Sequence, residues 1–205
     1  MTSPQPSGPY SLRPVGAADA DAVLAAFTSH PDMARQGEVE TIEQARTYVD
    51  WLRGEQRRAV AVTDSSGSMI GLVALSIDQD NRAGWFFYWM HAQHRGRGLI
   101  GRAAATVADR ALAPLEQGGW GLDRLELGHR ANNPASGAVA RAAGFVQEGV
   151  ERQKFLIDGE RHDVLAYGRL RTDRAPSTPH LPWAPQGQEM APSHYPGGHD
   201  DHPRS

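Results

Sequence analysis

The order of the β-prone segments constrains the fold of this chain more than any other feature. Three apolar runs follow one another closely, at residues 57–63, 69–77 and 84–90. Only the polar stretches DSSGS and DQDNRA separate them, and such turns between β-prone runs are typical of antiparallel hairpins. The sequence therefore predicts an antiparallel meander in the first half of the chain. A fold built from repeated parallel βαβ units is disfavoured.

Helical patterns precede this meander. A short strand, YSLRPV, is predicted at residues 10–15, and apolar residues at helical spacing then predict helices at 19–27 and 41–53. Thr41 can cap the second of these helices through its hydroxyl. The first half of the chain is therefore expected to place two helices before the meander.

The second half alternates helices and strands. Apolar residues mark one face of a helix from Gly98 to about Leu115, and LDRLELGH at 122–129 then predicts a strand. Residues 133–143 predict another helix. Residues 145–170 predict a closing β-hairpin with Asp158 and Gly159 in its turn.

Composition divides the chain into one domain and two tails. We expect residues 1–9 to be disordered, residues 10–171 to form the domain, and residues 172–205 to form a disordered tail rich in Pro, Gly and His. The chain has no cysteine and shows neither a signal peptide nor an apolar run long enough to span a membrane. We therefore expect a cytoplasmic protein without a membrane partner. Its net charge of −3 argues against a nucleic-acid partner.

A glycine-rich loop follows the meander. GRGLIG at residues 96–101 matches the pattern G-x-G-x-x-G of dinucleotide-binding domains. Those domains carry an acidic residue at the end of the next strand, whereas Asp123 here stands at the start of one, after an antiparallel region. We therefore interpret the loop as a pyrophosphate site at a helix N-terminus. Arg95, Arg97 and Arg102 are then placed to contact phosphate oxygens. The alternative, a glycine-rich turn with solvated arginines, stays open.

Three segments together carry a resemblance to a known family. They are YWMHAQHRGRGLIGRAAATVADRAL, LDRLELGHRANNPASGAVARAAGFVQEGV and DGERHDVLAYGRL, in this order. The chain resembles the GNAT acyl-CoA-dependent N-acetyltransferases over residues 10–171, and within them the RimJ/RimL type. The resemblance implies an α/β (α+β) fold with a mixed, mostly antiparallel sheet of about seven strands and about four helices, in which a central parallel pair splays apart.

The resemblance also implies a set of residues that bind acetyl-CoA as the acyl donor. The backbone of the strand end at Trp89, Met90 and His91 would meet the pantetheine arm. Ile100 departs from the small residue that the family prefers at the end of the phosphate loop. The residues implied for the phosphate loop and its surroundings are Arg95, Gly96, Arg97, Gly98, Leu99, Ile100, Gly101 and Arg102.

Asn133 and Ser136 stand at the start of the helix 133–143. From the residues alone they are capping groups, with Asn133 at the N-cap, Pro134 at the first helical position and Gly144 just past the end. The resemblance makes Ser136 the general acid near the CoA sulfur and Asn133 a contact of the pantetheine arm. For Asn133 both roles can coexist.

The general base is less well defined by the sequence. Trp85 stands where relatives often carry a glutamate, which leaves Glu126 as the candidate base; a structural ion pair with an arginine is its alternative. A backbone N–H near Met90 would meet the oxyanion.

The acceptor is expected at the loop between the first two helices. Asp32, Gln36 and Glu38 are candidates to contact an amine there, and a solvated loop is the alternative. His91 and His94 form H-x-x-H at a strand end without a third ligand nearby, so we expect no metal site.

We therefore expect an N-acetyltransferase that uses acetyl-CoA and a primary amine, either a protein N-terminus or a small molecule, in a ternary complex. A non-catalytic acyl-CoA-binding module is the main alternative, and RNA binding through the three arginines is a further one. A homodimer is left open.

Overall fold

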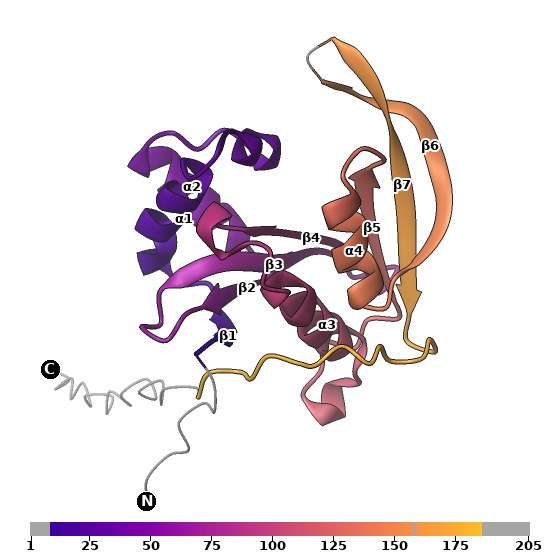
Figure 1. The fold of residues 1–205 in the computed structure, drawn as a ribbon. Helices are drawn as coiled ribbons and strands as arrows, with labels where there is room; N and C mark the ends of the chain where they lie inside the picture. The colour runs from indigo at the N-terminus through magenta and orange to yellow at the C-terminus, as the bar shows by residue number, and fades with distance from the viewer. Residues whose placement is uncertain (1–8, 158, 186–205) are drawn as a thin grey trace, which may run out of the picture.

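A computed structural model describes residues 9–157 and 159–185 (Figure 1). The described residues form one mixed sheet of seven strands in the order β1-β2-β3-β4-β5-β7-β6. The strands are β1 (Ser11–Pro14), β2 (Arg57–Thr63), β3 (Met69–Asp78), β4 (Ala83–Met90), β5 (Arg124–Arg130), β6 (Val146–Ile157) and β7 (Glu160–Leu170). The α-helices are α1 (Ala20–Phe27), α2 (Ile42–Leu52), α3 (Leu99–Leu112) and α4 (Pro134–Ala142).

The antiparallel meander predicted from the sequence is confirmed. β1 pairs with β2, β2 with β3 and β3 with β4, all antiparallel. The mixed sheet with one parallel pair, β4 and β5, confirms the expected fold class. The closing hairpin of β6 and β7 is also as predicted; Asp158 of its turn lies outside the described residues.

The helices cover both faces of the sheet. Helices α1 and α2 pack on one face with Leu72, Ala74 and Trp89. Helix α3 packs on the opposite face with Val73, Leu75 and other residues that alternate with the first set along the strands. The central strands are therefore buried on both sides, which explains their nearly uninterrupted apolar runs.

Local sequence signals set the helix starts. Thr41 caps α2 by accepting from the backbone N–H of Gln44 at 3.3 Å, and Gln44 accepts in return from Thr41 N–H at 3.0 Å. Asn133 caps α4 and accepts from the backbone N–H of Ser136 at 3.1 Å. Helix α3 begins after Gly98, which adopts a left-handed conformation and offers no side chain as a cap.

The parallel strands β4 and β5 separate after a short contact. Their pairing covers Ala83–Arg124, Gly84–Leu125 and Trp85–Glu126, and no ladder pair follows it within these two strands. Beyond Trp85, β4 stays paired only with β3, and β5 only with β7. The two strands therefore separate in the middle of the sheet, and Tyr88 of β4 reaches Ser136 in the first turn of α4.

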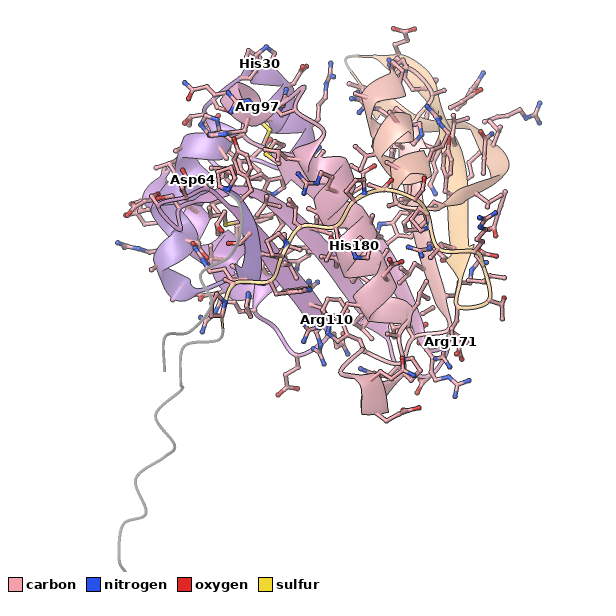
Figure 2. All side chains as sticks on the ribbon, turned by 60° about the horizontal axis from the view of Figure 1, so that its bottom comes forward. His30, Asp64, Arg97, Arg110, Arg171 and His180 are labelled. Carbon is pink, nitrogen blue, oxygen red and sulfur yellow. The ribbon has the colours of Figure 1, made fainter. Side chains whose placement is uncertain are left out.

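Residues 172–185 correct our expectation of a disordered tail from residue 172 onward. This segment, here called the strap, leaves β7, crosses α3 and reaches β1 (Figures 1 and 2). Leu181 is 2% exposed, and its N–H donates to Thr106 Oγ1 at 3.0 Å. Leu12 exchanges backbone hydrogen bonds with Pro182 and Ala184. The rest of the expected tails, residues 1–8 and 186–205, lies outside the described residues.

None of the helices in the described part of the chain is long and apolar enough to cross a membrane.

Candidate active site

Two adjoining cavities lie where β4 and β5 separate. The large cavity has a volume of about 690 Å³ and extends from the glycine loop to α4. The small cavity has a volume of about 180 Å³ and extends from the same strands towards Phe155 of β6. Six residues line both, and therefore mark their junction: Arg35, Gln36, Tyr88, Arg130, Asn133 and Ser136.

The glycine loop forms one end of the large cavity. Gly96 and Gly98 have φ angles of 76° and 69°, a conformation that glycine adopts without steric cost. A Cβ atom on either residue would meet no atom within 4 Å, so the space beside the loop is open to a ligand. The first N–H groups of α3 have no side-chain cap at Gly98. They leave the positive end of the helix dipole available to an anion.

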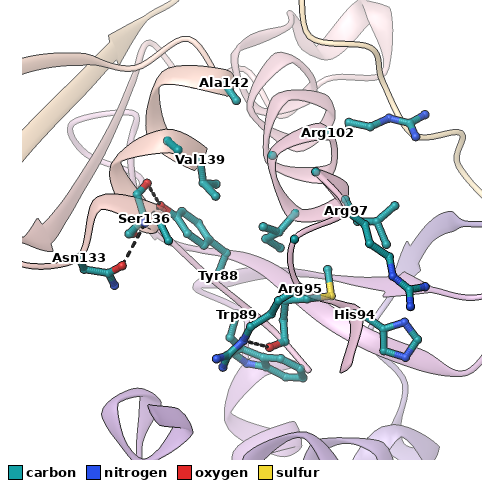
Figure 3. A pocket seen from close by; sticks show the side chains of 18 of the residues that line it. Tyr88, Trp89, His94, Arg95, Arg97, Arg102, Asn133, Ser136, Val139 and Ala142 are labelled. Atoms are coloured by element: carbon teal, nitrogen blue, oxygen red, sulfur yellow. Dashed lines mark hydrogen bonds between the residues drawn. The ribbon is translucent and has the colours of Figure 1, made fainter. Parts of the chain in front are cut away.

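Three arginines line the large cavity at this end, as the sequence predicts. Arg95 Nε donates to the carbonyl of Met90 at 3.1 Å, and Arg97 donates to Tyr10 OH at 3.2 Å. Arg102 points to the strap, where it donates to the carbonyls of Pro179 and His180 (Figure 3). Arg102 is therefore committed to the protein's own backbone, whereas Arg95 and Arg97 stay beside the glycines.

Beyond Trp85 the edge of β4 that faces the gap between β4 and β5 has no partner strand, and of its backbone groups the Met90 carbonyl accepts from Arg95 Nε. His91 N–H donates to Ile70 of β3 at 2.9 Å. Backbone groups in a strand alternate between its two edges, so those of Tyr88 and Met90 face away from β3, towards the gap. The ring of Trp89 lies on the face of the sheet that α1 and α2 cover, and its Nε1–H donates to Tyr48 OH at 3.1 Å. Trp89 and Met90 line the large cavity, whereas His91 is absent from the residues that line either cavity.

Ser136 and Tyr88 meet at the junction of the cavities. Tyr88 OH lies 2.8 Å from Ser136 Oγ and 2.9 Å from the carbonyl oxygen of Ser136 (Figure 3). Burial raises the pKa of Tyr88 to about 12, partly opposed by the hydrogen bond with Ser136. Tyr88 therefore stays protonated at neutral pH and can donate. When its proton points to Ser136 Oγ, the serine hydroxyl proton is free to point into the cavity.

The other predicted residues are placed as follows. Asn133 lines both cavities while it caps α4. Asp32 lines the large cavity and pairs with Arg35 at 3.1 Å. Gln36 lines both cavities, and Glu38 is not among the lining residues of either.

Glu126 lies outside both cavities. Its carboxylate accepts from Arg124 Nε at 2.7 Å, and Arg124 also pairs with Glu148 at 2.5 Å. This is the ion-pair arrangement that the sequence left as the alternative to a catalytic base.

Three residues at the junction were not predicted from the sequence. Tyr88 stands in the run WFFYWM, which reads as core, although alternation along β4 puts its hydroxyl opposite α4. Arg35 and Arg130 carry no local motif. Only the fold brings the loop before α2 close to the end of β5, so no spacing in the sequence could reveal them.

Comparisons with known proteins identify the family of this chain. A family model described as "Acetyltransferase (GNAT) domain" matches residues 11–146. The putative ribosomal N-acetyltransferase YdaF of Bacillus subtilis (strain 168) is 28% identical over 142 residues, 65% of this chain and 75% of that protein. The ribosomal-protein-serine acetyltransferase of Escherichia coli (strain K12) is 28% identical over 103 residues, 50% of this chain and 55% of that protein.

Solved structures share the fold. RimL, a ribosomal L7/L12 alpha-N-protein acetyltransferase solved in complex with coenzyme A, superposes with a TM-score of 0.68 at 22% identity. The match covers 80% of this chain and 95% of that one.

Proposed function

This chain belongs to the GNAT acetyltransferase family, and we propose that it transfers the acetyl group of acetyl-CoA directly to the primary amine of a protein N-terminus. The observation that carries this proposal is the pair of cavities that meet at Tyr88 and Ser136. One cavity is suited to a long phosphate-bearing donor and the other to a small acceptor end. The two curated relatives, both named as ribosomal acetyltransferases, support a protein acceptor.

The residues of the large cavity fit acetyl-CoA. Its glycine end offers open space, uncapped helix N–H groups and two arginines for a pyrophosphate. The edge of β4 that has no partner strand leads from there to Ser136 and offers backbone groups to an amide-bearing arm. When bound, acetyl-CoA supplies an acetyl group activated as a thioester.

The residues at the junction support direct transfer. The backbone N–H of Met90 faces the gap and is placed to stabilise the oxyanion as the amine nitrogen forms its bond to the carbonyl carbon. As the carbon–sulfur bond breaks, Ser136 Oγ gives its proton to the sulfur and takes the proton of Tyr88 OH. Tyr88 then regains a proton from water, which balances the proton that the acetylated amine releases to water. A free thiol has a pKa near 8.5, so the proton from Ser136 assists the departure of the sulfur.

The amine loses its proton to solvent in this scheme. The residues that line the small cavity include no Asp or Glu of the described chain, and Glu126 is held by Arg124. We therefore propose that the acceptor reacts as the neutral amine and passes its second proton to water. The rate should then rise with pH as the acceptor amine deprotonates.

A test of the function is release of the CoA thiol in the presence of peptides with free N-termini. Purified protein should release thiol with such peptides and not with the same peptides blocked by acetylation. Mass spectrometry should locate one acetyl group on the N-terminal nitrogen. Binding of acetyl-CoA with no turnover on any peptide or small amine would instead support the alternative of a non-catalytic acyl-CoA-binding module.

A further inference from the structure

The small cavity carries an unbalanced positive charge. Arg35, from the turn Pro31–Gln36, and Arg130, at the end of β5, both line it. Its lining includes no carboxylate among the described residues. The glycine loop and its arginines do not line it either, so this charge is separate from the phosphate end of the large cavity.

Of the two arginines, Arg130 has fewer polar partners among the described residues. Its guanidinium makes no hydrogen bond or ion pair with any residue in the part of the chain that the structure describes, and it is only partly exposed. Burial lowers its pKa, and the nearby positive charge of Arg35 lowers it further, whereas Asp32 acts in the opposite direction. A cation held away from water and near a like charge gains from a bound anion.

Arg35 is only partly neutralised by its neighbour. Asp32 contacts Arg35 at 3.1 Å, but the same carboxylate also lies 3.4 Å from His30 and 3.9 Å from Arg95. One carboxylate thus faces the guanidinium groups of both Arg35 and Arg95, which leaves a net positive potential at the junction.

Aromatic side chains form much of the remaining wall. Trp85, Phe87 and Phe155 line the small cavity, and Trp85 and Phe155 are 47% and 44% exposed. Such a wall accepts the hydrocarbon part of an acceptor but gives a second ammonium group no carboxylate partner. The charge of the site therefore disfavours polyamines and favours an acceptor that brings its own anion.

We propose that Arg35 and Arg130 form a carboxylate subsite that selects acceptors with an acidic group close to the reacting amine. The natural fit is a protein N-terminus with Asp or Glu in its first few residues. The α-carboxylate of a free amino acid has the same chemistry and is the other source. This inference rests on the proposed function and adds the class of acceptor.

The test compares acceptors that differ only in charge. Peptides beginning Ser-Asp-Glu, Ser-Asn-Gln and Ser-Lys-Lys, free serine and spermidine are assayed with saturating acetyl-CoA. We expect kcat/KM for the acidic peptide to exceed that for its amide counterpart by about tenfold or more. The preference should shrink as salt is raised. Free serine as the better acceptor would identify the α-carboxylate as the group recognised.

Two variants and a control locate the preference. Arg130→Gln and Arg35→Gln should each reduce the preference for the acidic peptide and leave the KM for acetyl-CoA unchanged. Arg141→Gln, on the exposed side of α4 and outside both cavities, should keep it. If Arg130→Gln does not fold, Arg35→Gln and the salt dependence decide.

Several outcomes would overturn this inference. Equal kcat/KM for acidic and amide peptides would reject the carboxylate subsite but would still agree with N-terminal acetylation. Spermidine as the best acceptor contradicts it, and so does a rise in KM for acetyl-CoA in Arg130→Gln, which would assign the arginine to the donor. Failure of every acceptor despite acetyl-CoA binding would count against the proposed function itself.

Discussion

Tyr88 has one proton and two acceptors within reach. Its hydroxyl can donate to Ser136 Oγ or to the Ser136 carbonyl, but not fully to both. In the proposed mechanism, the first arrangement leaves the serine proton free to reach the sulfur, and the second directs that proton towards the tyrosine. We therefore expect the rate to depend on which of the two hydrogen bonds Tyr88 makes.

Two substitutions separate the roles of this pair. Ser136→Ala removes the proposed donor and should lower kcat by about 10²-fold. Tyr88→Phe leaves the serine but removes the group that orients it and replaces its proton, so kcat should fall less, by about tenfold. The affinity for acetyl-CoA, measured by calorimetry, should change little in both. An unchanged kcat in Ser136→Ala would reject the serine as the acid.

The glycine loop offers a residue-scale test with an internal control. Gly98 and Gly67 both have positive φ, and a Cβ atom on either meets nothing within 4 Å. Gly98→Glu and Gly67→Glu should therefore cost similar stability, about 1–2 kcal/mol. Only Gly98→Glu puts a negative charge at the N-terminus of α3, so only it should weaken acetyl-CoA binding. Equal affinities in both variants would place the pyrophosphate elsewhere.

Features that depend on a few neighbouring residues, such as helix caps, could be predicted from the sequence. Asn133 was predicted as a cap because the pattern Asn-Pro-x-Ser carries that information within one turn. The junction residues Tyr88 and Arg130 depend on contacts between separate elements, and Arg130 has no partner in its own segment. For Glu126 the sequence left both catalysis and ion pairing open. Arg124 is near in sequence, but Glu148, which also binds Arg124, belongs to β6 and comes close only in the folded chain.

Among the elements, the strap is the one whose amino-acid composition gave a wrong prediction. Its many prolines and polar residues resemble a disordered tail, yet Arg102 and Thr106 of α3 hold its backbone through hydrogen bonds. Arg110 stacks over the ring of Trp183 at 4.4 Å, and Leu181 fills the core beneath. A segment without periodicity can thus be fixed by a neighbouring helix, a relation that no window of its own sequence reveals.

Truncations measure what the strap contributes. A chain that ends at residue 171 loses Leu181, Trp183 and the backbone bonds to Leu12, so its free energy of unfolding should fall by about 2–4 kcal/mol. A chain that ends at residue 185 keeps these contacts and should unfold at a higher urea concentration than the chain that ends at residue 171. Equal free energies of unfolding in urea for the two truncated chains would contradict this prediction.

For the whole molecule, the sequence predicted the order and type of the elements because each has its own period or run. The apolar strands β3 and β4 are buried on both faces, which follows from helices lying on both sides of the sheet. The gap between β4 and β5 could not be predicted in the same way. It depends on where two parallel strands stop pairing, and only the family resemblance indicated it.

A partly buried tyrosine packs on each face of the sheet, Tyr48 on one and Tyr88 on the other, and this predicts how the whole molecule responds to alkali. Burial raises the pKa of Tyr48 and of Tyr88 to about 12, against an ordinary value of 10.0. Above pH 10 the unfolded chain releases both phenolic protons while the folded chain retains them. The stability present below pH 10 should therefore be lost as the pH rises towards 12.

The size of this loss can be measured by substitution. Each tyrosine should contribute on the order of 2 kcal/mol to the loss. The double variant Tyr48→Phe, Tyr88→Phe lacks both phenols, so its free energy of unfolding should fall less than that of the wild type between pH 9 and pH 11.5. Urea unfolding at each pH gives the free energies, and phenolate absorbance reports the titration directly. A wild-type loss equal to that of the double variant would show that neither phenol is shielded in the folded chain. Because Tyr48 belongs to α2 on one face of the sheet and Tyr88 to β4 facing α4 on the other, the single variants separate the contributions of the two faces to the loss.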